Sequence, residues 1–421
     1  MEQQDQAITV IESLRTGLPP NVGVELYSVG NEKLIDGIKR YHISGIKNRG
    51  TIRFINGSWG AGKTHFFRLL REVAFANDCL VSNVELNAND AALNKFERIF
   101  FTIVRNIATP TYYTHGGKYD VTPFGNVLRE SLGFLSTGNR AIGDEIVFEQ
   151  YTKANERLFA DHSIDIDFKK MVQKYWETFI PESAQPETRD QLRAEILQWF
   201  SGEGKLPDYR KKFSVNKMVS KDNAKVMFQS LAGFVRLSGY QGLLIEFDEA
   251  EMAYSTMRKA ALRDAHNNLL SLINNIEMIP GLFLIYATTP DFFNDPKHGI
   301  TIYGALAGRI GKPESRPPKA LDKIWNFDEV TTTLEDYQSA AIKIRNIYAN
   351  AYPEAKEKLP GDTKTKEFVA RLNNEHPSMS PVRFWRVMVT GLIAYFDDIM
   401  EGETRTPEKL YYDVMDKLRE A

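Results

Sequence analysis

Cysteine is almost absent from this 421-residue chain, which contains a single one, Cys79. One cysteine excludes a disulfide framework, and its place before an expected strand suggests a thiol buried in the core. Long hydrophobic runs are also missing, since no apolar stretch approaches the length of a membrane span. The first residues, MEQQDQAITV, lack the basic and apolar regions of a signal peptide. These absences favour a cytoplasmic protein with no membrane partner.

The chain also lacks an excess of charge of either sign. Lys and Arg number 53 against 55 Asp and Glu, so the formal net charge is −2, while 43% of the residues are hydrophobic. Any contact with nucleic acid therefore has to come from a local patch and not from a global field. The length allows two or three domains with substantial cores.

The most informative segment that is present is Gly57–Thr64, GSWGAGKT, which follows the apolar run Thr51–Asn56. His65–Ala76 has a helical pattern, so the order is strand, glycine-rich loop and helix, the context of a P-loop. Glycines let successive backbone N–H groups turn toward a phosphate chain, and the helix dipole adds positive charge there. We therefore expect ATP to be bound by Gly57, Ser58, Trp59, Gly60, Ala61, Gly62, Lys63, Thr64 and His65.

A second segment complements this loop. The buried-strand run Leu243–Phe247 delivers two carboxylates, Asp248 and Glu249, at its carboxyl end, where parallel sheets bind ligands. Asp248 and the Thr64 hydroxyl are predicted to hold Mg²⁺, while Lys63 contacts the β- and γ-phosphates. Glu249 fits a base that takes a proton from the attacking water. The pair narrows the prediction to an ATP-hydrolysing site.

A third apolar run, Leu282–Ala287, ends in two threonines and a proline. The additional-strand class of P-loop ATPases places its sensor 1 residue at such a strand end, between the Walker B acid and the γ-phosphate. Thr288 is the first choice for this role and Thr289 the second. The alternative is an ordinary Thr-Thr-Pro strand end.

Three arginines stand where this class of ATPase needs cations. Arg309, about twenty residues after the third run, fits an arginine finger that enters the ATP site of a neighbouring subunit, which predicts a homo-oligomer. The alternative is a surface arginine in a Gly-rich loop. Arg383, near the start of a helix, fits a sensor 2 residue, and Arg386 one turn later competes for that role. Both also fit a solvated helix face.

Helical patterns fill most of the remaining chain, and the stretch after residue 109 is too long for a loop. The expected fold is α/β, a P-loop αβα sandwich with a parallel sheet, an α-helical insertion and a C-terminal α-helical lid. The predicted parts are an N-terminal arm (1–50), an ATPase core (51–108 and 226–331), the insertion (109–225) and the lid (332–421).

The strongest basic run is Lys205–Lys225, where seven lysines and arginines face two aspartates, a net charge of +5. Tyr209 and Phe213 interleave with the cations, as stacking platforms for unpaired bases would. The run predicts a DNA contact, and its alternative is a solvated surface.

Four segments together resemble the BrxD-type ATP-binding proteins of bacterial BREX phage-defence loci. They are Leu14–Pro19 (LRTGLP), the P-loop segment, Val81–Glu85 (VSNVE) and the LLIEFDEAE run. The core is also similar to the origin-recognition clade of AAA+ proteins, whose arginine positions correspond to Arg309 and Arg383. The resemblance implies an AAA+ fold, ATP hydrolysis, action on or near DNA, and an Lhr-like helicase and other BREX proteins as partners.

The expected function is a Mg²⁺-dependent AAA+ ATPase that uses ATP to set an assembly or conformational state on DNA, or on a helicase partner, in phage defence. One alternative is a nucleotide-gated signalling switch that acts through protein partners without binding nucleic acid. A structural adaptor that binds ATP but barely hydrolyses it is a third reading, which Glu249 disfavours.

Overall fold

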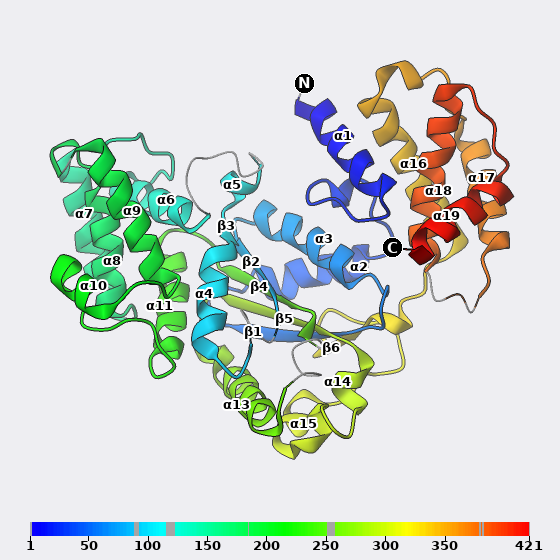
Figure 1. The fold of residues 1–421 in the computed structure, drawn as a ribbon. Coiled ribbons are helices and arrows are strands. Elements are labelled where there is room, and N and C mark those ends of the chain that lie inside the picture. Colours follow the sequence, from blue (N-terminus) through cyan, green and yellow to red (C-terminus); the bar gives the residue numbers. More distant parts are fainter. Residues whose placement is uncertain are drawn as a thin grey trace.

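A mostly parallel six-stranded sheet forms the centre of the molecule (Figure 1). The strand order is β3-β2-β4-β5-β1-β6, and only the edge pair β2–β3 is antiparallel among the residues that the structure describes. The strands are Thr51–Asn56 (β1), Leu80–Glu85 (β2), Ile107–Ala108 (β3), Leu243–Asp248 (β4), Leu282–Thr288 (β5) and Ile324–Asn326 (β6). This computed structural model describes residues 2–87, 92–114, 123–183, 185–250, 257–378, 380 and 383–420. The predicted α/β fold with a parallel sheet is confirmed at this level.

Helices cover both faces of the sheet, which explains why β4 and β5 are buried along their whole length. Ile245 and Phe247 share a core with the helices α4 (Phe96–Asn106) and α13 (Lys259–Asn275). Leu244 shares the opposite core with α2 (Glu32–Ile38) and α3 (Lys63–Ala76). Because side chains alternate along a strand, Glu246 and Asp248 face α3.

A group of helices lies between β3 and β4 in the sequence and packs beside the sheet (Figure 1). A buried carboxylate, Glu130 of α6, ties this group to the core. It accepts hydrogen bonds from Thr109 Oγ1 at 2.9 Å and Asn126 Nδ2 at 2.7 Å, and also from the hydroxyl of Tyr240, just before β4. The helices are α5 (Pro110–Thr114), α6 (Pro123–Thr137), α7 (Phe148–Ala160), α8 (Ile166–Glu177), α9 (Pro186–Phe200), α10 (Leu206–Phe213) and α11 (Ala224–Leu237).

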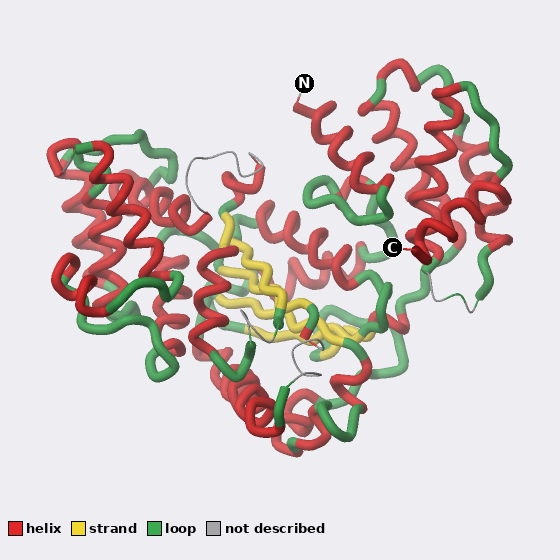
Figure 2. The backbone as a smooth tube through the Cα atoms, in the orientation of Figure 1, coloured by secondary structure: helices red, strands yellow, loops and turns green. Residues whose placement is uncertain are grey.

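The first helix, α1 (Glu2–Arg15), packs with the last helices of the chain (Figures 1 and 2). Arg15 forms an ion pair with Asp397, and Tyr352 donates a hydrogen bond to Glu12 at 2.9 Å. The N-terminal helix and the C-terminal helices therefore form one packed group. Those C-terminal helices are α16 (Leu334–Ala351), α17 (Asp362–Glu375), α18 (Phe384–Glu401) and α19 (Pro407–Glu420).

Some elements of the structure differ from what the sequence patterns indicate. The short edge strand β3 was not expected, and two short helices, α14 (Pro290–Asn294) and α15 (Gly304–Ile310), follow β5. Tyr209 and Phe213 are 6% and 3% exposed, so they pack in the core and are not available to stack on bases. Among the described residues, no helix combines the length and hydrophobicity that a membrane crossing requires. The single-turn and π elements are Val24–Leu26, Lys39–Ile43, Pro181–Ser183, Ile276–Met278, Ile300–Ile302, Phe327–Glu329 and Pro353–Ala355.

Candidate functional site

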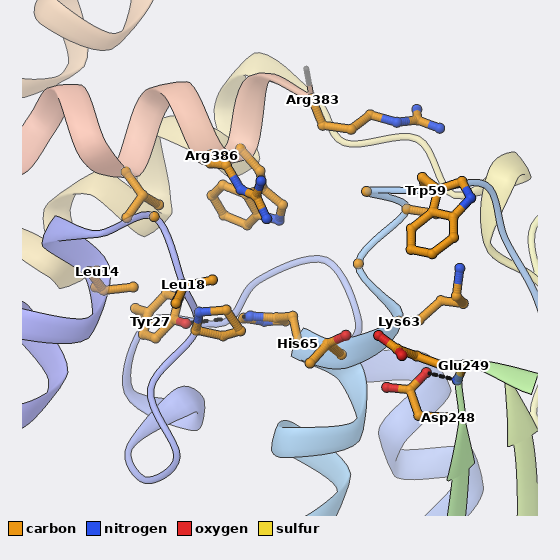
Figure 3. A pocket seen from close by; sticks show the side chains of 18 residues that line it. Leu14, Leu18, Tyr27, Trp59, Lys63, His65, Asp248, Glu249, Arg383 and Arg386 are labelled. Carbon is orange, nitrogen blue, oxygen red and sulfur yellow. Dashed lines mark hydrogen bonds between the residues drawn. The ribbon is translucent and has the colours of Figure 1, made fainter. Parts of the chain in front are cut away.

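A cavity of about 450 Å³ opens at the carboxyl ends of the strands, between the glycine loop (Gly57–Thr64), the segment Leu14–Tyr27 and helix α18 (Figure 3). This volume lies in the usual range for small-molecule sites. The glycine loop supplies Trp59 to Thr64, and His65 follows it. The other walls come from Leu14, Gly17, Leu18, Pro19, Tyr27, Asp248, Glu249, Arg383, Trp385, Arg386 and Val389.

The glycine loop has the backbone that its sequence predicts. Gly60 and Gly62 have φ angles of 77° and 91°, a region that residues with a β-carbon rarely adopt. Helix α3 begins at Lys63, so its first backbone N–H groups lack helical partners and lie at the cavity. The Lys63 ammonium donates to the carbonyl of Gly57 at 2.6 Å and lies 5.9 Å from the ring centre of Trp59. This loop therefore concentrates positive charge and N–H donors on one wall, which is what a phosphate chain requires.

Two carboxylates stand opposite this wall at the end of β4. Asp248 Oδ1 accepts a hydrogen bond from the backbone N–H of Glu249 at 2.9 Å, and Glu249 has a left-handed φ of 54°. Burial raises the pKa of Asp248, which Lys63 and a hydrogen bond from Thr64 partly offset. Burial also raises the pKa of Glu249, and the charges of Asp248 and Glu85 add to the effect. Two close carboxylates in a partly buried place are stabilised by a cation.

The donor set fits Mg²⁺ that is bound together with a phosphate ligand. The Thr64 hydroxyl lies close enough to the Asp248 carboxylate to lower its pKa, and both residues line the cavity. No group of three His, Cys, Asp or Glu side chains that could hold a metal exists within the described ranges. Mg²⁺ typically uses one or two protein oxygens and takes its other ligands from phosphates and water, so these two oxygens suffice.

A third acid of β4, Glu246, lies behind the pair and is fully buried. It forms an ion pair with Arg71 of α3 at 3.2 Å and accepts a hydrogen bond from Asn83 at 3.3 Å. Burial raises its pKa to about 7, against the opposing effect of Arg71. Glu246 joins β2, β4 and α3 beneath the site and does not line the cavity.

One acid that the sequence analysis missed connects the glycine loop to the C-terminal helices. Asp328, just after β6, accepts hydrogen bonds from the backbone N–H and the hydroxyl of Ser58, both at 2.9 Å. The same carboxylate lies 3.5 Å from the guanidinium of Arg383, which precedes α18. The signal for it was present, because an acid that follows the last strand of a parallel sheet reaches the same edge as Asp248.

The end of the cavity away from the carboxylates is apolar and aromatic. His65 lies between two groups of the N-terminal segment, with Nε2 at 2.9 Å from Ser28 Oγ and Nδ1 at 3.4 Å from the hydroxyl of Tyr27. Burial lowers the pKa of His65 to about 4, so the ring is neutral at pH 7. Gly17 has a φ of 74°, and a β-carbon there would lie 3.0 Å from Cγ of Arg386. The LRTGLP segment thus packs directly on α18.

Four predicted site residues lie outside the lining of this cavity, namely Gly57 and Ser58 at the start of the glycine loop, Thr288 and Arg309. Thr288 is fully buried, and strand alternation puts its side chain on the face of Tyr286, away from α3. Its carbonyl accepts the N–H of Gly57 at 3.1 Å, so it supports the glycine loop through the backbone. Arg309 is exposed at the end of α15. The other predicted groups, from Trp59 to His65 together with Asp248, Glu249 and Arg383, meet at one cavity.

Fold and site together define an α/β protein with a mostly parallel sheet and a ligand cavity at the carboxyl ends of its strands. The family described as BREX system ATP-binding protein BrxC/D matches residues 3–415, and the chain belongs to this family. The match confirms the BREX resemblance and covers the BrxC and BrxD types together. No curated protein and no solved structure matches the chain.

Proposed function

We propose that this protein is a Mg²⁺-dependent ATPase of the AAA+ type that couples ATP binding and hydrolysis to a change of conformation or assembly in phage defence. The observation that carries the proposal is the meeting of Lys63, Asp248, Glu249 and Arg383 at one nucleotide-sized cavity. The sheet order supports the AAA+ class, because an additional strand, β5, separates β1 from β4. Family membership supports ATP as the nucleotide.

The phosphate end of the proposed site is the glycine loop. Lys63 would exchange its bonds to backbone carbonyls for the β- and γ-phosphates, and the first N–H groups of α3 would bind the same chain. Thr64 and Asp248 would hold Mg²⁺, which supplies charge neutralisation at the phosphates when bound. Arg383 stands across the cavity from Lys63 (Figure 3), as a sensor 2 residue would.

Glu249 is the proposed base. A carboxylate accepts a proton more readily when its pKa is raised toward neutrality, and burial and Asp248 raise the pKa of Glu249. Its left-handed backbone angle fixes the side chain at the cavity, and such strain is common at functional sites. The sensor 1 role stays a prediction, with Thr288 first and Thr289, the N-cap of α14, second.

The apolar end of the cavity is proposed to take the adenine base. Tyr27 and Leu18 from the N-terminal segment face Trp385 and Val389 from α18 across this end. A planar base buries well between aromatic and aliphatic side chains. The base would then contact both the N-terminal segment and the C-terminal helices, which act as the proposed lid on the ATPase core.

Arg309 is proposed to act on a second copy of the chain. It lies outside the cavity of its own chain and is exposed, so it is available to a neighbouring subunit and not to the ATP site of its own chain. An arginine finger supplied in trans requires a homo-oligomer with a heterologous interface. Other BREX proteins, an Lhr-like helicase among them, are proposed as further partners.

Two variants test the ATPase proposal. Lys63→Ala should abolish ATP binding, whereas Glu249→Gln should retain ATP and lose hydrolysis, because an amide cannot take a proton. Affinity should be measured by calorimetry and turnover by phosphate release, with Lys211→Gln as a control substitution on the exposed face of α10. Hydrolysis at the parent rate by Glu249→Gln would refute its role as base.

The nucleotide-gated switch without nucleic acid is the second candidate. It is favoured because the aromatic residues of the Lys205–Lys225 run, Tyr209 and Phe213, are buried and cannot stack on bases. In that case ATP turnover should respond to a protein partner and remain unchanged when single- or double-stranded DNA is added.

A further inference from the structure

The basic run predicted from the sequence has lost its predicted stacking platforms, because Tyr209 and Phe213 are buried. Two of its seven cations are also paired with acids: Lys212 forms an ion pair with Glu195, and Lys217 forms one with Asp165 at 2.8 Å. Lys225 donates a hydrogen bond to Ser271 Oγ at 2.9 Å. The run therefore fits a nucleic-acid contact less well than its sequence indicates.

A second set of cations is different, and we name it the basic row: Arg49, Arg53, Lys323 and Arg309. Arg53 lies on β1 and Lys323 directly precedes β6, and the backbone N–H of Phe54 bonds to the Lys323 carbonyl at 2.9 Å. Adjacent strands lie about 4.8 Å apart, so these two residues are neighbours. The Lys323 ammonium donates to the carbonyl of Arg309, and Arg49 stands just before β1.

No member of the basic row forms an ion pair with any residue in the described part of the chain. Burial lowers the pKa of Lys323, and the charges of Arg309 and Arg53 lower it further, against Glu277. Burial and the charge of Arg49 likewise lower the pKa of Arg53, whose Nε is buried without a hydrogen-bond partner. Like charges held together without counter-charges destabilise the fold, and an external anion removes that cost.

The nearby acids supply this compensation only in part, since Asp322 opposes the lowering of the pKa of Arg53 but forms no ion pair with it. Asp322, the acid next to Lys323, forms an ion pair with Arg316 at 2.8 Å and accepts the backbone N–H of Lys319 at the same distance. Glu277 acts on Lys323 only through the longer-range charge effect noted above. The row therefore keeps an excess of positive charge at the surface.

The arrangement of the row decides which anion fits. The row extends over three elements: Arg53 and Lys323 lie side by side on adjacent strands, Arg49 precedes Arg53 along the chain, and the Lys323 ammonium reaches the carbonyl of Arg309 in α15. The two end members, Arg49 and Arg309, are exposed, and none of the four lines the cavity described above, so the row is open and does not enclose a single point. A single phosphate needs donors that converge on it, whereas a polymer with regularly spaced charges matches an open line.

We propose that the basic row is a binding surface for the phosphodiester backbone of nucleic acid. Arg49, Arg53 and Lys323 supply the phosphate contacts, whereas Arg309 at the end of the row keeps the role toward a neighbouring subunit proposed above. The row lies toward the amino-terminal ends of β1 and β6, whereas the ATP cavity lies at the carboxyl ends, so the two sites are separate and the inference goes beyond the proposed ATPase function. Binding here is independent of base sequence, because these groups are cations that recognise phosphates.

The test uses the full-length protein and fluorescently labelled single- and double-stranded oligonucleotides of several sequences. Arg49→Gln/Lys323→Gln should weaken binding alike for every sequence. The slope of log affinity against log salt should shrink by roughly 0.7–0.9 for each lost contact, because fewer counterions are released. Lys205→Gln/Lys211→Gln removes the same charge from exposed positions of the other run and should leave affinity and slope near the parent values.

Arg49→Gln alone is the second variant. Arg49 is exposed, so this change should not disturb folding, whereas the double variant also removes the hydrogen bond from Lys323 to Arg309. ATP affinity and turnover are measured on the same samples, so a failed ATPase and a failed DNA surface are distinguished. The inference is overturned if both variants keep the DNA affinity and salt slope of the parent, or if the control variant loses as much affinity as they do. It is also overturned if inorganic phosphate displaces DNA as well as competing unlabelled DNA does at the same ionic strength. Loss of self-association with unchanged DNA binding would also overturn it and make the row an interface between copies.

Discussion

Asp328 is expected to control ATP affinity in two opposite ways, which two substitutions separate. Its carboxylate holds Ser58 of the glycine loop through two hydrogen bonds of 2.9 Å, and it also lies 3.5 Å from Arg383. The first contact orders the loop that binds phosphates. The second places a negative charge beside the site and engages a cation that ATP would otherwise attract.

Asp328→Ala removes both effects, but the loop contact dominates. Two hydrogen bonds to a charged group at a half-exposed position contribute about 2 kcal/mol together, at the low end of the usual range. Losing them should weaken ATP binding by about 30-fold. Asp328→Asn keeps one acceptor oxygen for the Ser58 N–H, and its amide NH2 can donate to the Ser58 hydroxyl oxygen in place of the second bond, so the main loss is the charge. Its exposed pair with Arg383 is worth at most about 1 kcal/mol, so Asn should tighten ATP binding by up to about fivefold.

Calorimetric titration with ATP and Mg²⁺ measures both variants, with thermal unfolding to show that each is folded. A second titration at high salt should reduce the gain in Asp328→Asn, because an exposed charge effect is screened. The reasoning is refuted if Asn and Ala change the affinity in the same direction, or if Ala binds ATP as tightly as the parent.

Three further results are expected. Arg309→Ala should bind ATP normally and hydrolyse it poorly, and mixing it with Lys63→Ala should restore some turnover; no rescue at any ratio would contradict action in trans. Burial lowers the pKa values of His42 and His65 to about 4, so the free energy of unfolding that each neutral histidine contributes is complete above pH 6.5 and is lost as the pH falls toward 4, by about 3 kcal/mol for each histidine. Unfolding midpoints measured in roughly equal steps between pH 7 and 4 follow this loss, and His65→Gln should make the midpoint depend less on pH. Gly17→Ala should lower the unfolding temperature and ATP affinity together, because a φ of 74° is strained for a residue with a β-carbon and that carbon would lie only 3.0 Å from Cγ of Arg386 on α18.

Residues carried by the central strands were predictable from the sequence. Apolar runs with no polar interruption identify buried parallel strands, and the carboxyl ends of such strands share one edge of the sheet. This logic predicts Asp248 and Glu249 beside the glycine loop, and the structure brings them to the same cavity. It does not reach Asp328, because the preceding strand β6 has only three residues and makes no long apolar run.

The rest of the site could not be derived in this way, because its contacts join distant parts of the chain. The sequence of α1 does not show that this helix packs on α16 and α18, with which it shares a core. The interleaved Tyr209 and Phe213 illustrate the opposite error. An aromatic residue beside a lysine on a helix fits base stacking or a core equally well, and only the neighbouring helices α8 and α9 decide in favour of the core.

The connections between these helices and the core indicate how nucleotide could be sensed. The chain leaves α1 through Gly17 and Gly23, both at positive φ, and is then fixed on the core because Glu72 of α3 accepts the backbone N–H groups of Val24 and Glu25 at 2.9 Å. The return connection is the short segment before α16, which begins at Leu334. One wall of the cavity thus belongs to α1 and α18 and the other to the core. A ligand that contacts both walls stabilises the arrangement in which the two walls face each other, so we expect ATP affinity and the position of the C-terminal helices to be linked.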